Sequence, residues 1–284
     1  MDDAAVLPFG DGAIVLTHDM LVEGVHYLPD DAPADVAWKL LAVNLSDLAA
    51  KGAEPLGVLL GYAMTDDAGW DAAFAAGLGE AARTLGVPLL GGDTVRMPAA
   101  APRVLGLTAL GRAPAGGATA RSGARVGDTL SVSGTIGDAG AGIAIRQGRA
   151  TGDVWLEQRY LRPQPRLDLG RRIASHVHAM ADLSDGLLID ASRMAAASGC
   201  ALRIDLAAVP LSDALRAMTG DGLDARLTAA TAGDDYELLF TAPPHAEMPV
   251  AMTAIGQAIE GAGLSLSWHD DPLPLPAVLG YAHE

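Results

Sequence analysis

Lysine is nearly absent from this chain of 284 residues, which contains only Lys39 and Lys51; arginine supplies the rest of its formal positive charge. The pattern G-x-x-x-x-G-K-[ST] is also missing, which excludes a Walker-type phosphate loop. If the protein handles polyphosphates, arginines or metal ions must therefore neutralise their charge.

The chain also has very little cysteine and no net positive charge. The one cysteine, Cys200, cannot form an internal disulfide. The formal net charge is −16, and a surface of this sign repels nucleic acids and anionic membranes, so neither is an expected partner. Apolar runs are too short and interrupted to span a bilayer, and the first residues do not resemble a signal peptide. These features favour a cytoplasmic enzyme or binding protein.

The hydrophobic content is 50%, which supports a sizeable core in one large domain or two ordinary ones. Strand and helix patterns alternate along both halves of the sequence. The segment 112–118 is rich in Gly and Ala, and it predicts a boundary between domains 1–115 and 116–284. We therefore expect a mixed α/β fold of two domains, each a mixed sheet covered by helices.

Particular elements follow from local patterns. Residues 13–17 predict a buried strand, and 33–51 predict a helix that starts with Pro33 and is closed by Gly52. Near the C-terminus, the sequence from 244 to 263 predicts another helix.

Aspartates recur where predicted strands end. Asp19 follows one strand, Asp93 follows another strand and two glycines, and Asp182 and Asp185 enter a helix after a third. Ligands bind at the carboxyl ends of strands in α/β sheets. Taken singly, each aspartate is more often a helix cap or a turn residue.

The aspartates form a more informative set together. Asp2, Asp3 and Asp47 add to their number, and hydroxyl groups accompany them at Thr17, Ser46 and Ser184. Carboxylate and hydroxyl oxygens are hard ligands that suit Mg²⁺, and clustered carboxylates repel one another without cations. The glycine-rich "SGTIGDAGAG" could bind phosphate or form an ordinary strand-to-helix turn, and the two readings stay equally open.

Several motifs follow one another in a familiar order: "THDMLVEGVHY", "NLSDLAAKGAEPLG", "LLGGDT", "LRPQPR", "ADLSDGLLID" and "GDDYELLFT". This order resembles the thiamine-monophosphate kinase family, within the superfamily of aminoimidazole ribonucleotide synthetase. The resemblance covers nearly the whole chain. "VEGVH" together with "NLSDLAAKGA" favours this family over its superfamily relatives.

The resemblance implies a reaction and an assembly. Members transfer the γ-phosphoryl group of ATP directly to thiamine monophosphate, by in-line transfer with several Mg²⁺ ions. They are homodimers in which the N-terminal sheets join into a barrel. The acceptor is an anionic phosphate oxygen, so the reaction needs no general base.

The resemblance also implies site residues. The implied metal ligands are Asp2, Thr17, His18, Asp19, Asp47, Asp93, Asp182 and Asp185. The implied ATP contacts are Gly92, Asp93, Arg121 and Ser184, and the implied substrate contacts are His26, Asp234 and Tyr281. Asp47, Asp182 and Arg121 are expected to be catalytic, by positioning charge around the transferred group.

Two of these positions depart from the family pattern. His18 stands where the family usually has Thr or Ser, and Asp234 stands where it usually has Glu. The sequence also begins at Met1-Asp2, where the family usually has a helical segment before the first aspartates. Together these departures motivate an alternative, a relative that binds nucleotide or thiamine phosphate without turnover. Another ATP-using member of the superfamily is the second alternative.

Overall fold

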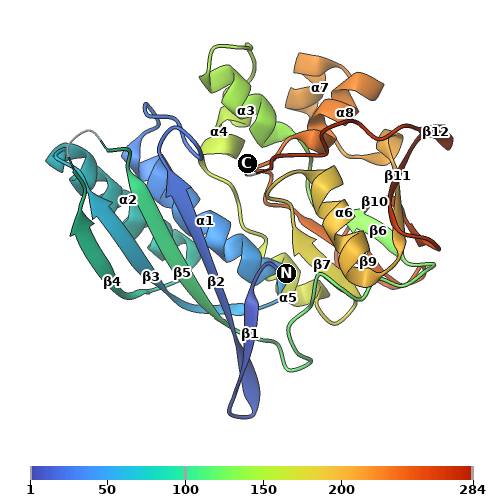
Figure 1. The fold of residues 1–284 in the computed structure, drawn as a ribbon, viewed down its shortest axis with the longest axis horizontal. Helices are drawn as coiled ribbons and strands as arrows, with labels where there is room; N and C mark the ends of the chain where they lie inside the picture. The colour runs from blue at the N-terminus through green and yellow to red at the C-terminus, as the bar shows by residue number, and fades with distance from the viewer. Residues whose placement is uncertain (1, 99–100, 283–284) are drawn as a thin grey trace.

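The computed structural model describes residues 2–98 and 101–282 (Figure 1). The first half forms a five-stranded sheet in the order β1-β2-β5-β3-β4. Only β3 and β4 are parallel neighbours; the other pairs are antiparallel. The strands of this sheet are β1 (Ala5–Phe9), β2 (Gly12–Val22), β3 (Glu54–Met64), β4 (Leu89–Arg96) and β5 (Val104–Arg112).

The second half forms a seven-stranded sheet in the order β12-β11-β8-β10-β6-β9-β7. This sheet is also mixed, since β8 and β11 are parallel and the other neighbours antiparallel. Its strands are β6 (Thr129–Val132), β7 (Ala179–Asp182), β8 (Ala201–Asp205), β9 (Leu238–Ala242), β10 (Thr253–Ile259), β11 (Gly263–Trp268) and β12 (Asp271–Leu273).

Eight α-helices occur in the described ranges, and none of them is long and apolar enough to cross a membrane. They are α1 (Pro33–Ala50), α2 (Ala68–Leu85), α3 (Asp138–Arg146), α4 (Val154–Leu161), α5 (Leu167–Ile173), α6 (Leu187–Ser198), α7 (Asp213–Thr219) and α8 (Leu223–Thr231). The predicted mixed α/β fold with two sheets is confirmed.

Helix α1 connects the two halves of the molecule. Pro33 occupies its first turn, and Gly52, at φ 62°, turns the chain after its end, as the sequence predicted. The helix packs on β2, β5 and α2 of the first half and contacts α5 and β7 of the second (Figure 1). Because both sides are covered, nearly all its residues are buried, including polar ones.

Each sheet has its own hydrophobic core. Leu40, Leu41 and Leu105 belong to the core of the first half. A third, smaller cluster packs Ala49 and Ala50 of α1 against residues of the second half. The halves are therefore joined by apolar packing around the last turn of α1, next to the position of Asp47.

The predicted helix at 244–263 is wrong, because β10 occupies its centre. A register irregularity between Ala254 and Gly256 lets Ile255 and Ala258, three positions apart, both face the core. That spacing imitates a helical period. A Cβ at Gly256 would lie 1.9 Å from the carbonyl oxygen of Arg203, so glycine is required for this close pairing.

Candidate functional site

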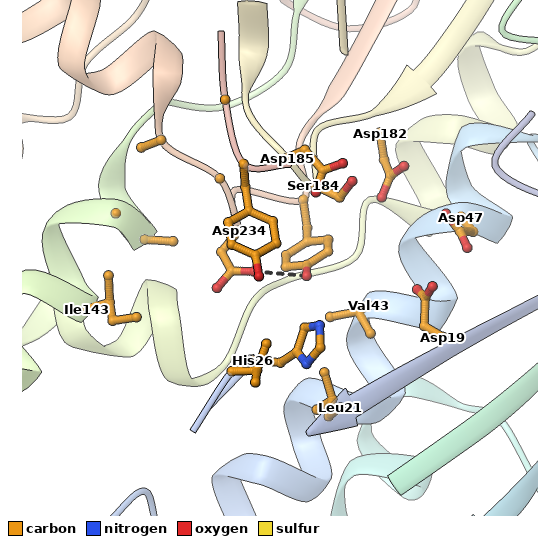
Figure 2. Close-up of a pocket in the computed structure, with 18 of the residues that line it drawn as sticks. Asp19, Leu21, His26, Val43, Asp47, Ile143, Asp182, Ser184, Asp185 and Asp234 are labelled. Carbon is orange, nitrogen blue, oxygen red and sulfur yellow. Dashed lines mark hydrogen bonds between the residues drawn. The ribbon is translucent and has the colours of Figure 1, made fainter. Parts of the chain in front are cut away.

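A cavity of about 790 Å³ lies between the two halves (Figure 2). Its walls come from β2 and the loop after it, α1, α3, the segment after β7, the segment before β9, and the chain around Tyr281. One wall is acidic and contains Asp19, Asp47, Asp182 and Asp185. The remainder is mostly apolar and aromatic, formed by residues that include Leu21, Val25, Val43, Ile143, Tyr236 and Tyr281. The cavity can thus receive a ligand with an anionic, cation-requiring part and a ring-containing part.

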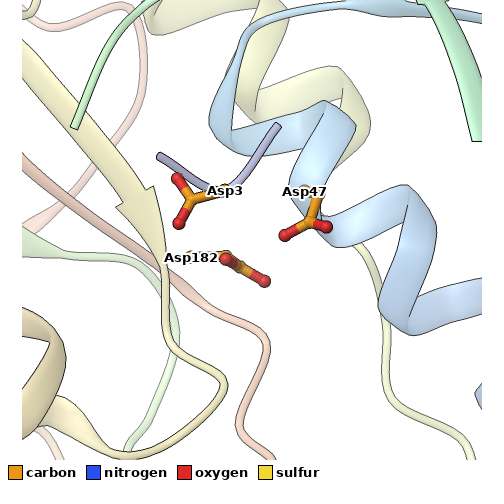
Figure 3. A group of neighbouring side chains, drawn as sticks. All are labelled: Asp3, Asp47 and Asp182. Carbon is orange, nitrogen blue, oxygen red and sulfur yellow. The ribbon is translucent and has the colours of Figure 1, made fainter. Parts of the chain in front are cut away.

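Three carboxylates meet at the acidic end (Figure 3). Asp3, Asp47 and Asp182 each offer one oxygen, and these oxygens all lie within 4.8 Å of one another. Asp3 precedes β1, Asp47 lies in the last turn of α1, and Asp182 ends β7. The group therefore depends on three segments that are distant in the sequence. Its hard oxygen donors at this separation fit a divalent cation such as Mg²⁺.

Burial and mutual repulsion dominate the electrostatics of this wall. The pKa of Asp47 is raised well above its usual range, by burial first and then by the charges of Asp182 and Asp19. Burial also raises the pKa of Asp182, and Asp3 adds to the effect. The pKa of Asp19 is raised mainly by burial. A cation shared by these groups would relieve the repulsion that raises these pKa values.

Two basic residues hold the N-terminal segment against the site. The Lys51 side chain is fully buried; its Nζ lies 2.8 Å from Oδ2 of Asp3 and also pairs with Asp2. Arg121 pairs with Asp3 through its side chain, and its backbone N–H donates to Oδ2 of Asp2 at 3.2 Å. Asp3 therefore reaches the carboxylate group, although the sequence motifs had singled out Asp2. Nothing in the local sequence distinguishes the two neighbours.

Neutral polar groups orient the carboxylates. Thr17 donates its hydroxyl hydrogen to Asp47, and the Ser46 hydroxyl donates to Oδ2 of Asp182 at 2.6 Å. Oδ1 of buried Asn44 accepts the backbone N–H of Asp19 at 3.0 Å. The sequence motifs assigned no role to Asn44. Its signal was a polar residue about one turn before Asp47 on the same side of the helix, next to the apolar Leu40 and Leu48.

The predicted substrate residues all line the same cavity. Oδ2 of Asp234 lies 2.7 Å from Nζ of Lys39. Nδ1 of His26 accepts the backbone N–H of Val22 at 3.0 Å, so a neutral His26 carries its ring proton on Nε2. The backbone N–H of Tyr281 donates to the carbonyl of Asp185 at 2.9 Å and places the ring at the cavity.

Other predicted residues lie elsewhere. His18 hydrogen-bonds to Thr108 and does not line the cavity, because alternate residues of β2 face opposite sides of the sheet and its neighbours Thr17 and Asp19 face α1. Gly92 and Asp93 lie on the exposed edge strand β4 and do not line it either.

Ser184 and Asp185, by contrast, are part of the cavity wall. Asp185 is paired with Arg193, whose NH1 lies 2.5 Å from its Oδ2, so a cation would have to compete with this arginine.

Comparisons with known proteins follow the same division of the chain. Residues 1–113 match the family model for the AIR synthase related protein N-terminal domain, and 125–269 match the model for its C-terminal domain. A thiamine-monophosphate kinase of Caulobacter vibrioides is 41% identical over 299 residues, covering 100% of this chain and 84% of the relative. The chain belongs to the thiamine-monophosphate kinase family.

Further members of the thiamine-monophosphate kinase family agree in sequence and structure. The Salmonella typhimurium enzyme is 43% identical over 249 residues, covering 85% of this chain and 75% of that one. A solved structure described as AaThiL complexed with AMPPCP and TMP superposes with a TM-score of 0.86 at 31% identity, covering 95% of this chain and 90% of that one. The fold that surrounds the cavity is therefore shared with a relative solved with an ATP analogue and TMP.

Proposed function

We propose that this member of the thiamine-monophosphate kinase family transfers the terminal phosphoryl group of ATP to thiamine monophosphate in the cavity between its halves. A bond forms from an acceptor phosphate oxygen to the γ-phosphorus, and the bond from that phosphorus to the β–γ bridging oxygen breaks. The products are thiamine diphosphate and ADP. The proposal rests on one observation: a single cavity has an acidic wall and an aromatic wall. The chain that forms it belongs to this family.

The protein's task in this reaction is positioning and charge neutralisation. A phosphate oxygen is already anionic at neutral pH, so no side chain has to remove a proton from it. Arg121 contributes positive charge near Asp3, and Ser184 contributes a hydroxyl at the cavity wall. These two residues, with Gly92 and Asp93, remain the proposed ATP contacts. His26, Asp234 and Tyr281 are the proposed contacts for the thiamine moiety.

The acidic wall is the proposed site for Mg²⁺. Asp3, Asp47 and Asp182 would hold one ion, given the spacing of their oxygens. Bound ions would neutralise the polyphosphate of ATP and the acceptor phosphate, which the carboxylates alone would repel. The other proposed ligands are Asp2, Thr17, Asp19, Asp93 and Asp185. His18 is not among them, because its ring bonds to Thr108 and faces away from the cavity. Of the proposed ligands, Asp19 and Asp185 line the cavity, and an ion bound to Asp185 would have to replace its contact with Arg193.

We also propose the family's homodimer, with the first-half sheets of two copies joined into a barrel. The side chains along β4 are exposed, including those of Leu89, Leu90 and Val95, and Leu59 on β3 is exposed as well. An exposed edge strand with apolar side chains favours association with another strand or sheet. Domains 1–115 and 116–284 and a cytoplasmic location complete the proposal.

The first experiment incubates the pure protein with ATP, Mg²⁺ and thiamine monophosphate, and measures thiamine diphosphate by chromatography. EDTA is the control for metal dependence. Product that requires metal would support the proposed reaction. ATP binding without product would favour the non-catalytic relative, and turnover with a different acceptor would favour another ATP-using member of the superfamily.

A further inference from the structure

The two lysines of this chain follow one stripe of α1, with Lys39 inside the helix and Lys51 as its C-cap residue. Lys39, Val43, Asp47 and Lys51 are spaced by four residues, which places them on one gradually winding face of the helix. Val43 and Asp47 line the cavity between them. Lys51 supports the acidic end, through its contacts with the N-terminal aspartates. Lys39 lies two turns before Asp47, at the end of the stripe nearer to the proposed thiamine contacts.

Lys39 is held in a defined place. Its side chain is only 3% exposed, and its Nζ lies 2.7 Å from Oδ2 of Asp234 and 4.0 Å from the ring centroid of Tyr160. The Tyr160 hydroxyl in turn donates to Oδ2 of Asp31 at 2.9 Å. A buried ammonium group needs both a counterion and a favourable surface, and here Asp234 and the tyrosine ring provide them.

The residue at the other end of this ion pair has an unusual backbone. Asp234 has φ 68° and Tyr236 has φ 52°, both in the left-handed region that L-residues rarely adopt. The Asp234 N–H donates to the carbonyl of Ser184 at 2.8 Å, and its Oδ1 accepts the Tyr236 hydroxyl at 3.0 Å. Both carboxylate oxygens of Asp234 are thus held, at the wall of the cavity.

We propose that Lys39 is a positioning residue for thiamine phosphate, which it affects by fixing the Asp234 carboxylate without touching the substrate. This inference rests on the proposed function. An aspartate has a short side chain, so the place of its carboxylate depends on the backbone turn and on the groups that hold its oxygens. Lys39 holds Oδ2 from the first half of the chain, while the turn belongs to the second. Removing the ammonium group would leave the carboxylate without this counterion and would release Oδ2, while Oδ1 keeps the Tyr236 hydroxyl.

The test separates the two substrates. Lys39→Met keeps the length of the side chain and removes its charge. We expect the KM for thiamine monophosphate to rise about tenfold or more, while the KM for ATP stays within about twofold. Lys39→Arg restores the charge with a different shape, so the KM for thiamine monophosphate should rise less. Equal changes in both KM values, or no change in either, would overturn the inference.

A double-mutant cycle tests whether Lys39 acts through Asp234. Asp234→Asn removes the charged partner, and adding Lys39→Met to it should raise the KM for thiamine monophosphate by no more than about twofold further. Additive effects would contradict a positioning role. If Lys39→Met does not fold, Lys39→Gln carries the test, because it also removes the charge that pairs with Asp234. Unchanged KM values for both substrates would then refute the inference.

Lys51→Met is the matched contrast on the same helix. We expect it to raise the Mg²⁺ concentration needed for half-maximal activity, and to change the KM for thiamine monophosphate less than Lys39→Met does. If Lys51→Met instead raised the KM for thiamine monophosphate more than Lys39→Met does, the roles given to the two lysines would be contradicted. Turnover of the wild type is measured first, so that the two proposals can fail separately. If the wild type makes no thiamine diphosphate, the result counts against the proposed function. If the wild type is active and Lys39→Met has the same KM values, the result counts against this inference alone.

Discussion

The Ser46 hydroxyl donates a 2.6 Å hydrogen bond to Oδ2 of Asp182, and both side chains are buried. Ser46 lies on α1 of the first half, and Asp182 is the last residue of β7 in the second. The bond therefore holds a carboxylate of the proposed metal site from across the boundary between the two sheets. It also opposes the rise in the Asp182 pKa that burial causes.

Replacing Ser46 by Ala should weaken metal binding. Loss of a buried hydrogen bond to a charged group costs about 1–3 kcal/mol, and 1.4 kcal/mol corresponds to about tenfold in affinity. We expect Mn²⁺, used as a probe in calorimetry, to bind about tenfold more weakly. Ser212→Ala is the matched control, since its hydroxyl donates to Asp138 at the same 2.6 Å distance outside the carboxylate group. Equal Mn²⁺ affinity in wild type and Ser46→Ala would refute the prediction.

Replacing Asp47 by Asn should abolish Mg²⁺-dependent turnover and leave the fold intact. The change is nearly isosteric and removes a buried charge whose pKa is raised by burial and by like-charged neighbours. The metal-free variant should therefore unfold at the same or a higher temperature than the wild type. Product formation and thermal unfolding are measured together, with Asp213→Asn as an exposed control. A folded, active Asp47→Asn protein would eliminate Asp47 as an essential metal ligand.

Replacing His26 by Ala should weaken the binding of thiamine monophosphate more than the binding of ATP. His26 lines the cavity apart from Asp47 and Asp182, on the loop after β2 (Figure 2). We expect the KM for thiamine monophosphate to rise about tenfold and the KM for ATP to change little. Steady-state kinetics with each substrate varied in turn provides the measurement. Equal losses for both substrates would show that the histidine has no selective role.

Because Asp235 is buried, we expect the stability of the folded protein to depend on pH. Asp235 is fully buried, and burial raises its pKa well above the usual 3.8, although the backbone N–H of Gly137 donates to it. The folded state therefore keeps its proton at pH values where the unfolded state has lost it. That contribution to stability declines as pH rises from near 3.8 through the raised pKa.

Asp235→Asn should flatten this dependence, because the amide oxygen still accepts from Gly137 and no charge has to be buried. Unfolding temperatures are measured between about pH 5 and about pH 8 with EDTA present, so that metal binding does not contribute. We expect the wild type to lose more stability than the variant over this interval, by a few degrees. Parallel curves for the two proteins would contradict a raised pKa at Asp235.

Helix α1 shows how much of the fold is encoded locally. Pro33, the apolar positions that follow it and Gly52 are enough to predict its start and end. The alternating strand and helix patterns likewise predict a mixed α/β fold. The segment at 244–263 fails because a register irregularity in β10 depends on its pairing with β6 and β8, which no local period reveals.

The candidate site, like the fold, is predicted from the sequence only in part. The sequence predicts one set of acidic residues, and the structure places Asp19, Asp47, Asp182 and Asp185 around one cavity. The sequence does not predict that His18 faces away from the cavity, since that depends on the side of β2 that α1 covers.

The sequence by itself determined the period of α1, the mixed α/β class and the placement of aspartates at strand ends, because these features depend on neighbouring residues. Only the tertiary structure decided that Asp3 joins Asp47 and Asp182, and that Lys39 pairs with Asp234 across 195 positions of sequence. These contacts exist because α1 is packed between two sheets. Their distances are fixed by that packing, and local periodicity carries no information about them.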